Sequence, residues 1–215
     1  MIFDPSCPWC YIGLRQMRHA LTLRPTVTAD VKLWPFMLNP DVPTAGLDRN
    51  SYLCHKYGSS TRLQRMEEAV EAIGETVGLR FNFRAIDFTP NTLYAHRFIQ
   101  LASSQKKGEQ ALELVFAAYF LRGMDIGDPA LLESLGRQLG FAPHAIRNLL
   151  TSGVEREWVL FANQRAQRLG ISGVPTFVFD RRLIICGAQE AATLARMIDA
   201  ASHMGNIVGQ FAGQA

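Results

Sequence analysis

The sequence has little of what marks several other classes of protein. No apolar run approaches the ~18 residues that a membrane-spanning helix needs. Hydrophobic residues make up 48% and charged residues 19% of the 215 positions, which is typical of a globular chain. The 22 Lys and Arg barely outnumber the 19 Asp and Glu and are scattered, so nothing indicates a polyanionic partner. We therefore expect a soluble protein that binds neither membrane nor nucleic acid.

Cysteine is also scarce in this chain. Four cysteines in 215 residues are far too few for a scaffold held together by disulfides. Met1 is followed directly by Ile-Phe-Asp-Pro (2–5) and not by a basic and then apolar leader, so we expect a cytoplasmic location. Two of the four cysteines nevertheless lie together in Cys-Pro-Trp-Cys (7–10). This segment is therefore the first candidate for a functional site.

Both ends of the chain carry β-strand signals. Apolar residues recur at helical spacing between residues 8 and about 24, and β-preferring residues follow at about 27–36, which predicts a β-α-β start. Near the other end, the runs 176–179 and 183–186 predict a β-hairpin, although its turn lacks the usual glycine. After the hairpin, apolar residues at helical spacing (Leu194, Met197, Ile198 and Ala201) predict a closing helix and hence a β-β-α end.

The segment between these ends has an almost entirely helical pattern, from about 48 to 170. Thr89-Pro90 and Asp128-Pro129 are typical of helix starts, with proline in the first turn. Neither end can bury a sheet alone, so we expect the two ends to combine into one core that is interrupted by helices. The expected boundaries are 1–40 and 165–205 for the core, 41–164 for the inserted helical domain and 206–215 for a tail.

The Cys-x-x-Cys spacing at a helix start indicates thiol chemistry. Unpaired backbone N–H groups and the positive end of the helix dipole surround Cys7 and favour a thiolate nucleophile there. One turn later the helix returns Cys10 to the same face, on the apolar stripe, where it is shielded. Disulfide exchange needs this pairing of an exposed thiolate with a protected thiol that resolves the mixed disulfide.

Two other interpretations of the cysteine pair stay open. Cys-x-x-Cys is half of many zinc sites, but Cys54 and Cys186 stand singly and no second Cys-x-x-Cys or His-x-x-x-His occurs, so we expect no metal. A plain structural disulfide is the other alternative, although a bridge that closes so short a loop constrains the unfolded chain least. Redox catalysis is the interpretation that the pattern favours.

Five motifs follow one another along the chain. They are Cys-Pro-Trp-Cys-Tyr-Ile-Gly (7–13), Trp-Pro-Phe-Met-Leu-Asn-Pro (34–40), Pro-Asn-Thr-Leu-Tyr-Ala-His-Arg (90–97), Asp-Ile-Gly-Asp-Pro (125–129) and Gly-Val-Pro-Thr-Phe-Val-Phe (173–179). Each is weak alone, but in this order they resemble the DsbA family of thioredoxin-fold oxidoreductases, and more narrowly its cytoplasmic FrnE-type branch. The resemblance extends to about residue 200.

The resemblance implies an α/β, thioredoxin-like fold with a large helical domain inserted between its β-α-β and β-β-α halves. It also implies a cis peptide bond at Val174-Pro175 that faces Cys7 and Cys10. Read alone, Pro175 would be an ordinary proline at a strand entry. In the family, this proline keeps metal away from the dithiol, and the backbone before it pairs with an extended substrate peptide.

Further site residues follow from the same resemblance. Pro8 and Trp9, between the two cysteines, would set the redox poise, and Asn39 is a candidate substrate contact. Asn91 and His96 lie in a shared motif, but each could equally cap the chain or fill the core. Their role stays open.

The predicted function is thiol:disulfide exchange, in which Cys7 attacks and Cys10 resolves. We expect no bound cofactor beyond this dithiol; the partners would be cysteine-containing proteins, with glutathione as a small co-substrate. The protein could be a monomer or a homodimer. We expect Cys54 and Cys186 to be lone buried thiols. Because family members usually have a longer first strand, we also expect that this chain starts late.

Two alternatives from other classes remain. 2-Hydroxychromene-2-carboxylate isomerases and kappa-class glutathione transferases share the architecture and use a serine where Cys7 stands, so a glutathione-dependent isomerase or transferase is one alternative. A chaperone-like binding protein without redox turnover is the other. The presence of both cysteines makes dithiol exchange available and favours the oxidoreductase.

Overall fold

The computed structural model describes the backbone of residues 1–212, and the side chains of residues 1–142 and 144–203. The first half of its core comprises β1 (Ile2–Phe3), α1 (Pro8–Thr22) and β2 (Trp34–Pro35). The second half comprises β5 (Thr176–Phe179), β6 (Leu183–Cys186) and α9 (Ala191–Ala212). The elements between them are β3 (Leu47–Asp48), α2 (Arg49–Tyr57), α3 (Ser60–Thr76), a 3₁₀ turn (Phe83–Ala85), β4 (Phe88–Thr89), α4 (Leu93–Ser104), α5 (Gly108–Phe116), a π-helical turn (Ala117–Leu121), α6 (Pro129–Gln138), α7 (Pro143–Thr151) and α8 (Arg156–Arg168).

The two ends of the chain form one four-stranded sheet in the order β2-β1-β5-β6. The β1 and β2 strands are parallel, whereas β5 is antiparallel to both β1 and β6. The hairpin has the predicted strands, and its turn places two residues other than glycine, Asp180 and Arg181, in the left-handed region at φ 47° and 58°. This turn joins the strands without the glycine that such a connection usually uses.

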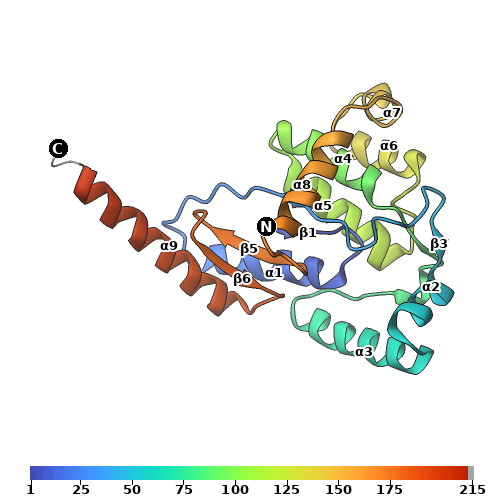
Figure 1. The fold of residues 1–215 in the computed structure, drawn as a ribbon, viewed down its shortest axis with the longest axis horizontal. Coiled ribbons are helices and arrows are strands. Elements are labelled where there is room, and N and C mark those ends of the chain that lie inside the picture. Colours follow the sequence, from blue (N-terminus) through green and yellow to red (C-terminus); the bar gives the residue numbers. More distant parts are fainter. Residues whose placement is uncertain (213–215) are drawn as a thin grey trace.

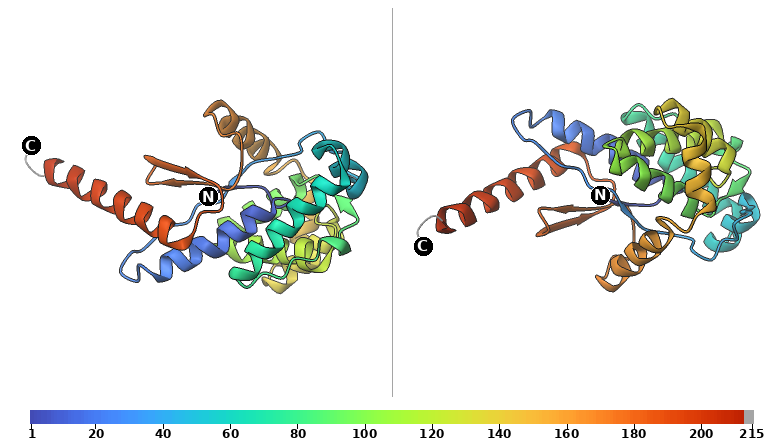
Figure 2. Two further views of the ribbon diagram at one scale, coloured as in Figure 1. Left: turned by 90° about the horizontal axis from the view of Figure 1, so that it is seen from below. Right: turned by 90° about the horizontal axis from the view of Figure 1, so that it is seen from above.

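Helices cover the two faces of the sheet unequally. On one face, Met17 and Ala20 of α1 pack with Phe177 of β5 and Leu194 of α9. On the other face, Ala166 of α8 packs with buried residues of the β1 and β2 side of the sheet. Figures 1 and 2 show α1 and α9 side by side, with the β5–β6 hairpin beyond the reach of α8. The outer face of the hairpin is therefore partly open to solvent.

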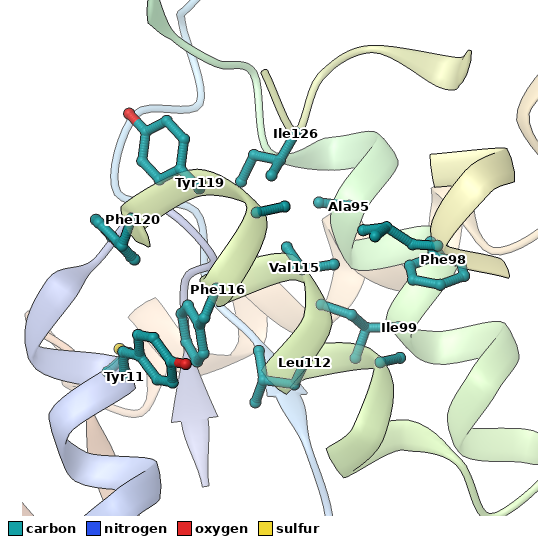
Figure 3. Packing of buried hydrophobic residues seen from close by; sticks show 14 of the residues in the cluster. Tyr11, Ala95, Phe98, Ile99, Leu112, Val115, Phe116, Tyr119, Phe120 and Ile126 are labelled. Carbon is teal, nitrogen blue, oxygen red and sulfur yellow. The ribbon is translucent and has the colours of Figure 1, made fainter. Parts of the chain in front are cut away.

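The inserted helices and the sheet share one hydrophobic core. Tyr11 of α1 stacks on Phe116 of α5 with ring centroids 4.9 Å apart, and its hydroxyl donates a 2.6 Å hydrogen bond to Glu113. Figure 3 shows Tyr11 beside Phe116 and Phe120, at the end of a row of apolar residues from α4 and α5. The predicted fold, a thioredoxin-like α/β fold interrupted by a helical insertion, is confirmed.

Several predicted boundaries differ from the structure. Only Trp34–Pro35 of the predicted strand 27–36 is a strand, because the adjacent β1 offers two residues for pairing. Thr89 does not open a helix but pairs with Leu47 in a small β3–β4 ladder. The α4 helix starts later, at Leu93, whose N–H is accepted by the Asn91 side chain.

Two further predicted boundaries fall within helices. The division at 164/165 falls inside the continuous helix α8, from which Ala166 packs against the sheet. The predicted tail 206–215 is helical as far as Ala212, since α9 continues to that residue, and 213–215 lie outside the described residues. Over the part of the chain described, no helix combines the length and apolar character needed to cross a membrane.

Candidate active site

The start of α1 places Cys7 at the N-cap position. Its backbone is extended (φ −96°, ψ 112°), Pro8 occupies the first helical turn, and no side chain caps the helix. The Cys7 N–H donates to the Asp4 carbonyl and the Cys10 N–H donates to the Cys7 carbonyl, each at 3.0 Å. Proline loses nothing at this position, because its missing N–H would have no helical partner. The turn thus holds both cysteines on one side of the helix.

The Val174-Pro175 loop covers Cys7. The Val174-Pro175 peptide bond is cis, and the Cys7 Sγ donates a hydrogen bond of 3.5 Å to the Val174 carbonyl, 167 residues away in sequence. The sheet makes this contact possible, because β5 follows the loop directly and lies next to β1. The loop therefore approaches the cysteine pair as predicted and is hydrogen-bonded directly to Cys7.

Cys10 is fully buried, and both cysteines are free thiols. Burial raises the pKa of Cys10 well above its ordinary value, and the neighbouring Cys7 sulfur raises it further through hydrogen bonding and charge. Cys10 is therefore held as a thiol. The sequence predicts an exposed Cys7, but its exposure is only 4%, because the Val174 loop covers it.

The sequence analysis does not single out Asp4 as a site residue, yet Asp4 is a fully buried group of the site. Its carboxylate is fully buried and accepts hydrogen bonds from the Ser6 N–H (2.8 Å), the Ser6 hydroxyl (2.9 Å) and the Leu38 N–H (2.6 Å). Burial raises the pKa of Asp4, and the hydrogen bonds oppose that rise. Asp4 thus ties the cysteine turn to the segment after β2. The Asp-x-Ser pattern, typical of side chains that bond their own turn, was the available signal.

The remaining predicted contact residues lie around this turn in different environments. Trp9 is 36% exposed, whereas Pro8 is half-buried at the helix start. The Asn39 side-chain oxygen, Oδ1, accepts hydrogen bonds from the Tyr52 hydroxyl (3.0 Å) and the Lys56 ammonium, both on α2. These hydrogen bonds join Asn39 to α2. Among the described side chains, no hydrogen bond joins Asn39 to Cys7 or Cys10.

Asn91 and His96 have structural partners. The Asn91 amide donates to the Val42 carbonyl at 2.6 Å and its oxygen accepts from the Leu93 N–H. His96 is buried against Phe3, and its Nε2 is 3.2 Å from the Phe36 carbonyl. Burial lowers the pKa of His96 to about 3, so the ring is neutral and Nε2 donates to that carbonyl.

The other two cysteines were predicted to be buried, but neither is. Cys54 is half-buried on α2, a helix without fully buried residues, and its Sγ lies 3.3 Å from the Asn50 side chain. Cys186 is exposed, since it lies on the edge strand β6, on the face of the hairpin opposite α1 and α9. Within the described side chains, no group of three or more His, Cys, Asp or Glu residues is placed to hold a metal ion.

The fold and the paired thiols define the chain as a thioredoxin-fold protein with a Cys-x-x-Cys segment at a helix start. Residues 1–199 match the model of the DSBA-like thioredoxin domain family, and the chain belongs to that family. A crystal structure of a probable DsbA oxidoreductase from Streptomyces coelicolor is similar over 94% of this chain and 88% of its own, with 27% identity and a TM-score of 0.85.

Two more distant structures share the fold. The cytosolic disulfide reductase DsbM from Pseudomonas aeruginosa, solved with GSH, is 18% identical with a TM-score of 0.65 over 96% of both chains. A 2-hydroxychromene-2-carboxylate isomerase is 17% identical with a TM-score of 0.63, over 100% of this chain and 97% of its own. At these identities the likeness concerns the architecture alone.

Proposed function

We propose that the protein is a thiol:disulfide oxidoreductase that acts through Cys7 and Cys10. The observation that carries this proposal is the contrast within the pair. Cys7 sits at the helix start, hydrogen-bonded to the Val174 carbonyl, while Cys10 is fully buried with a raised pKa. Exchange chemistry needs one thiol that attacks first and a second that waits in reserve. Membership of the DSBA-like family supports the same chemistry.

The proposed reaction conserves atoms and electrons. The Cys7 thiolate attacks a substrate disulfide, which forms a Cys7–substrate S–S bond and releases one substrate thiolate. Cys10 passes its proton to that thiolate and attacks the Cys7 sulfur, which releases the second substrate thiolate and leaves a Cys7–Cys10 disulfide. Two electrons pass from the protein dithiol to the substrate, and the reverse sequence oxidises a substrate dithiol.

Cysteine-containing proteins are the proposed substrates, and glutathione is the proposed small partner. An extended peptide could pair with the backbone of Val174, next to Cys7, as a strand adds to a sheet edge. The likeness to DsbM, which was solved with GSH, supports testing glutathione. Assignment to the FrnE-type branch and a cytoplasmic location stay predictions.

Trapping experiments test the proposed roles of the two cysteines. Cys10→Ser should accumulate mixed disulfides through Cys7, because nothing resolves them, whereas Cys7→Ser should accumulate none. Non-reducing electrophoresis and mass spectrometry of purified protein mixed with a disulfide-bonded peptide would show the adducts. Equal trapping by both variants, or by neither, would contradict the assignment.

A glutathione-dependent isomerase is the alternative, favoured by the likeness to the isomerase structure along the entire chain. Such enzymes use a serine where Cys7 stands, so the chemistry does not need the dithiol. Activity of Cys7→Ser separates the two functions. Isomerisation of a 2-hydroxychromene-2-carboxylate with glutathione, retained in this variant, would support the alternative, and loss of disulfide exchange would support the oxidoreductase.

A further inference from the structure

Gly13 occupies an unexpected position within α1. It is buried in the interior of a regular 15-residue helix, where glycine is less stabilising than alanine. Gly13 is absent from the residues with positive φ, so its backbone conformation does not require glycine. The packing around Gly13 therefore explains why glycine stands at this position.

The surroundings of Gly13 leave little room for a side chain. A Cβ at this position would lie 3.0 Å from Pro175 Cγ, 3.2 Å from Phe177 Cζ and 3.4 Å from Pro175 Cβ. The two shorter distances are tighter than about nine in ten real Cβ contacts, so Pro175 and Phe177 would have to move by a few tenths of an ångström. The pyrrolidine ring of Pro175 thus rests directly on the backbone of the helix that carries Cys7 and Cys10.

The Pro175 loop is also held from its other side. The Pro175 carbonyl accepts a 2.7 Å hydrogen bond from the Gly187 N–H, and Thr176 pairs with Ile2 and Cys186 across the sheet. The Thr176 hydroxyl also donates to the Gly173 carbonyl at 2.8 Å. A methyl group at Gly13 would therefore push against a loop that the sheet already fixes.

We propose that Gly13 is a positioning residue for the redox site. By having no side chain, it seats Pro175 against α1 and keeps the Val174 carbonyl 3.5 Å from the Cys7 sulfur. The inference rests on the proposed function, since it concerns how a substrate reaches Cys7. A peptide disulfide must satisfy the Val174 backbone and the Cys7 sulfur together, whereas a small disulfide needs only the sulfur.

The test compares two substrates in one variant. Gly13→Ala should lower the rate constant for exchange with an extended peptide disulfide by about tenfold, because small misplacements of reacting groups are costly, but that for hydroxyethyl disulfide by less than about twofold. Gly153→Ala is the matched control, since a Cβ at Gly153 meets nothing within 4 Å, and both rates should stay unchanged. Equal losses with both substrates, or no loss, would overturn the proposal.

A second variant keeps the test decisive if Gly13→Ala does not fold. Removing the ring in Pro175→Ala takes away the 3.0 Å contact and leaves the 3.2 Å contact with Phe177 Cζ, so Gly13→Ala should cost less stability and less exchange rate in that background than in the wild-type protein. Full additivity in the double variant would contradict an action through Pro175. If wild-type protein exchanges with neither disulfide, the proposed function itself fails, and this outcome differs from unequal or equal losses in an active protein.

Discussion

At the start of α1, Cys7 and Cys10 are buried as neighbours, whereas Cys54 on α2 and Cys186 on β6 stand apart and retain solvent exposure. The first region brings together a helix start, a loop from the far end of the chain and a buried carboxylate. By contrast, Cys54 contacts Asn50 within its own helix, and Cys186 contacts the Thr176 hydroxyl at the start of β5. Under the proposed function, exposure alone is not sufficient for a redox centre; a second thiol within reach and a site for the substrate are also needed.

Serine substitutions should give the largest contrast between the two regions. Cys7→Ser should abolish exchange with a peptide disulfide, because no nucleophile remains, whereas Cys54→Ser and Cys186→Ser should change the rate by less than about twofold. Stopped-flow or gel-based assays of exchange would measure this. A tenfold loss in Cys186→Ser would break the comparison and bring the hairpin into the mechanism.

Acid should lower the free energy of unfolding through His96, which is buried against Phe3 of β1. Its pKa in the fold is about 3 against an ordinary 6.5, so the unfolded chain binds the additional proton between these values. The contribution of neutral His96 to the free energy of unfolding is complete above pH 6.5. It is lost as the pH falls from 6.5 towards 3, and the total loss is on the order of 5 kcal/mol.

His96→Gln provides the matched comparison for this effect. A glutamine amide can still donate to the Phe36 carbonyl but does not titrate, so the pH-dependent part should disappear. Urea unfolding of both proteins at a series of pH values measures the difference in unfolding free energy, in which the contribution of Asp4 is common to both. A difference that stays constant from pH 7 to 4 would show that the fold does not lower the pKa of His96.

Alkylation should separate the exposed Cys186 from the buried Cys10. Iodoacetamide should modify the exposed Cys186 at least about tenfold faster than the buried Cys10 in the native protein, and all four cysteines should react alike after denaturation. Peptide mass spectrometry over time would give the rates. Rapid labelling of Cys10 in the folded protein would contradict its burial.

The features that could be predicted from sequence are those with local causes. Pro8 in a first helical turn, the Asp128 N-cap and the β5–β6 hairpin each depend on residues a few positions apart. The order of the five motifs then indicated the fold, which no single motif could do.

The features that sequence reasoning missed depend on distant partners. The resemblance implied that the Val174-Pro175 loop faces the cysteines, but the burial of Cys7 was missed, as was the hydrogen bond from the Leu38 N–H to Asp4 across the parallel strands. The exposure of Cys186 follows from an edge position that only the assembled sheet defines. The burial of a small side chain depends on the tertiary structure, so it cannot be predicted from composition or periodicity.

The reduction potential of the Cys7–Cys10 couple tests the central claim most directly. Equilibration of the protein with a series of glutathione ratios, followed by mass spectrometry, would report each disulfide that forms. We predict one two-electron transition, assigned to a Cys7–Cys10 disulfide, between about −270 and −120 mV, the span of thioredoxin-fold oxidoreductases. A pair that stays reduced throughout, or a disulfide that forms with Cys54 or Cys186 instead, would contradict the account.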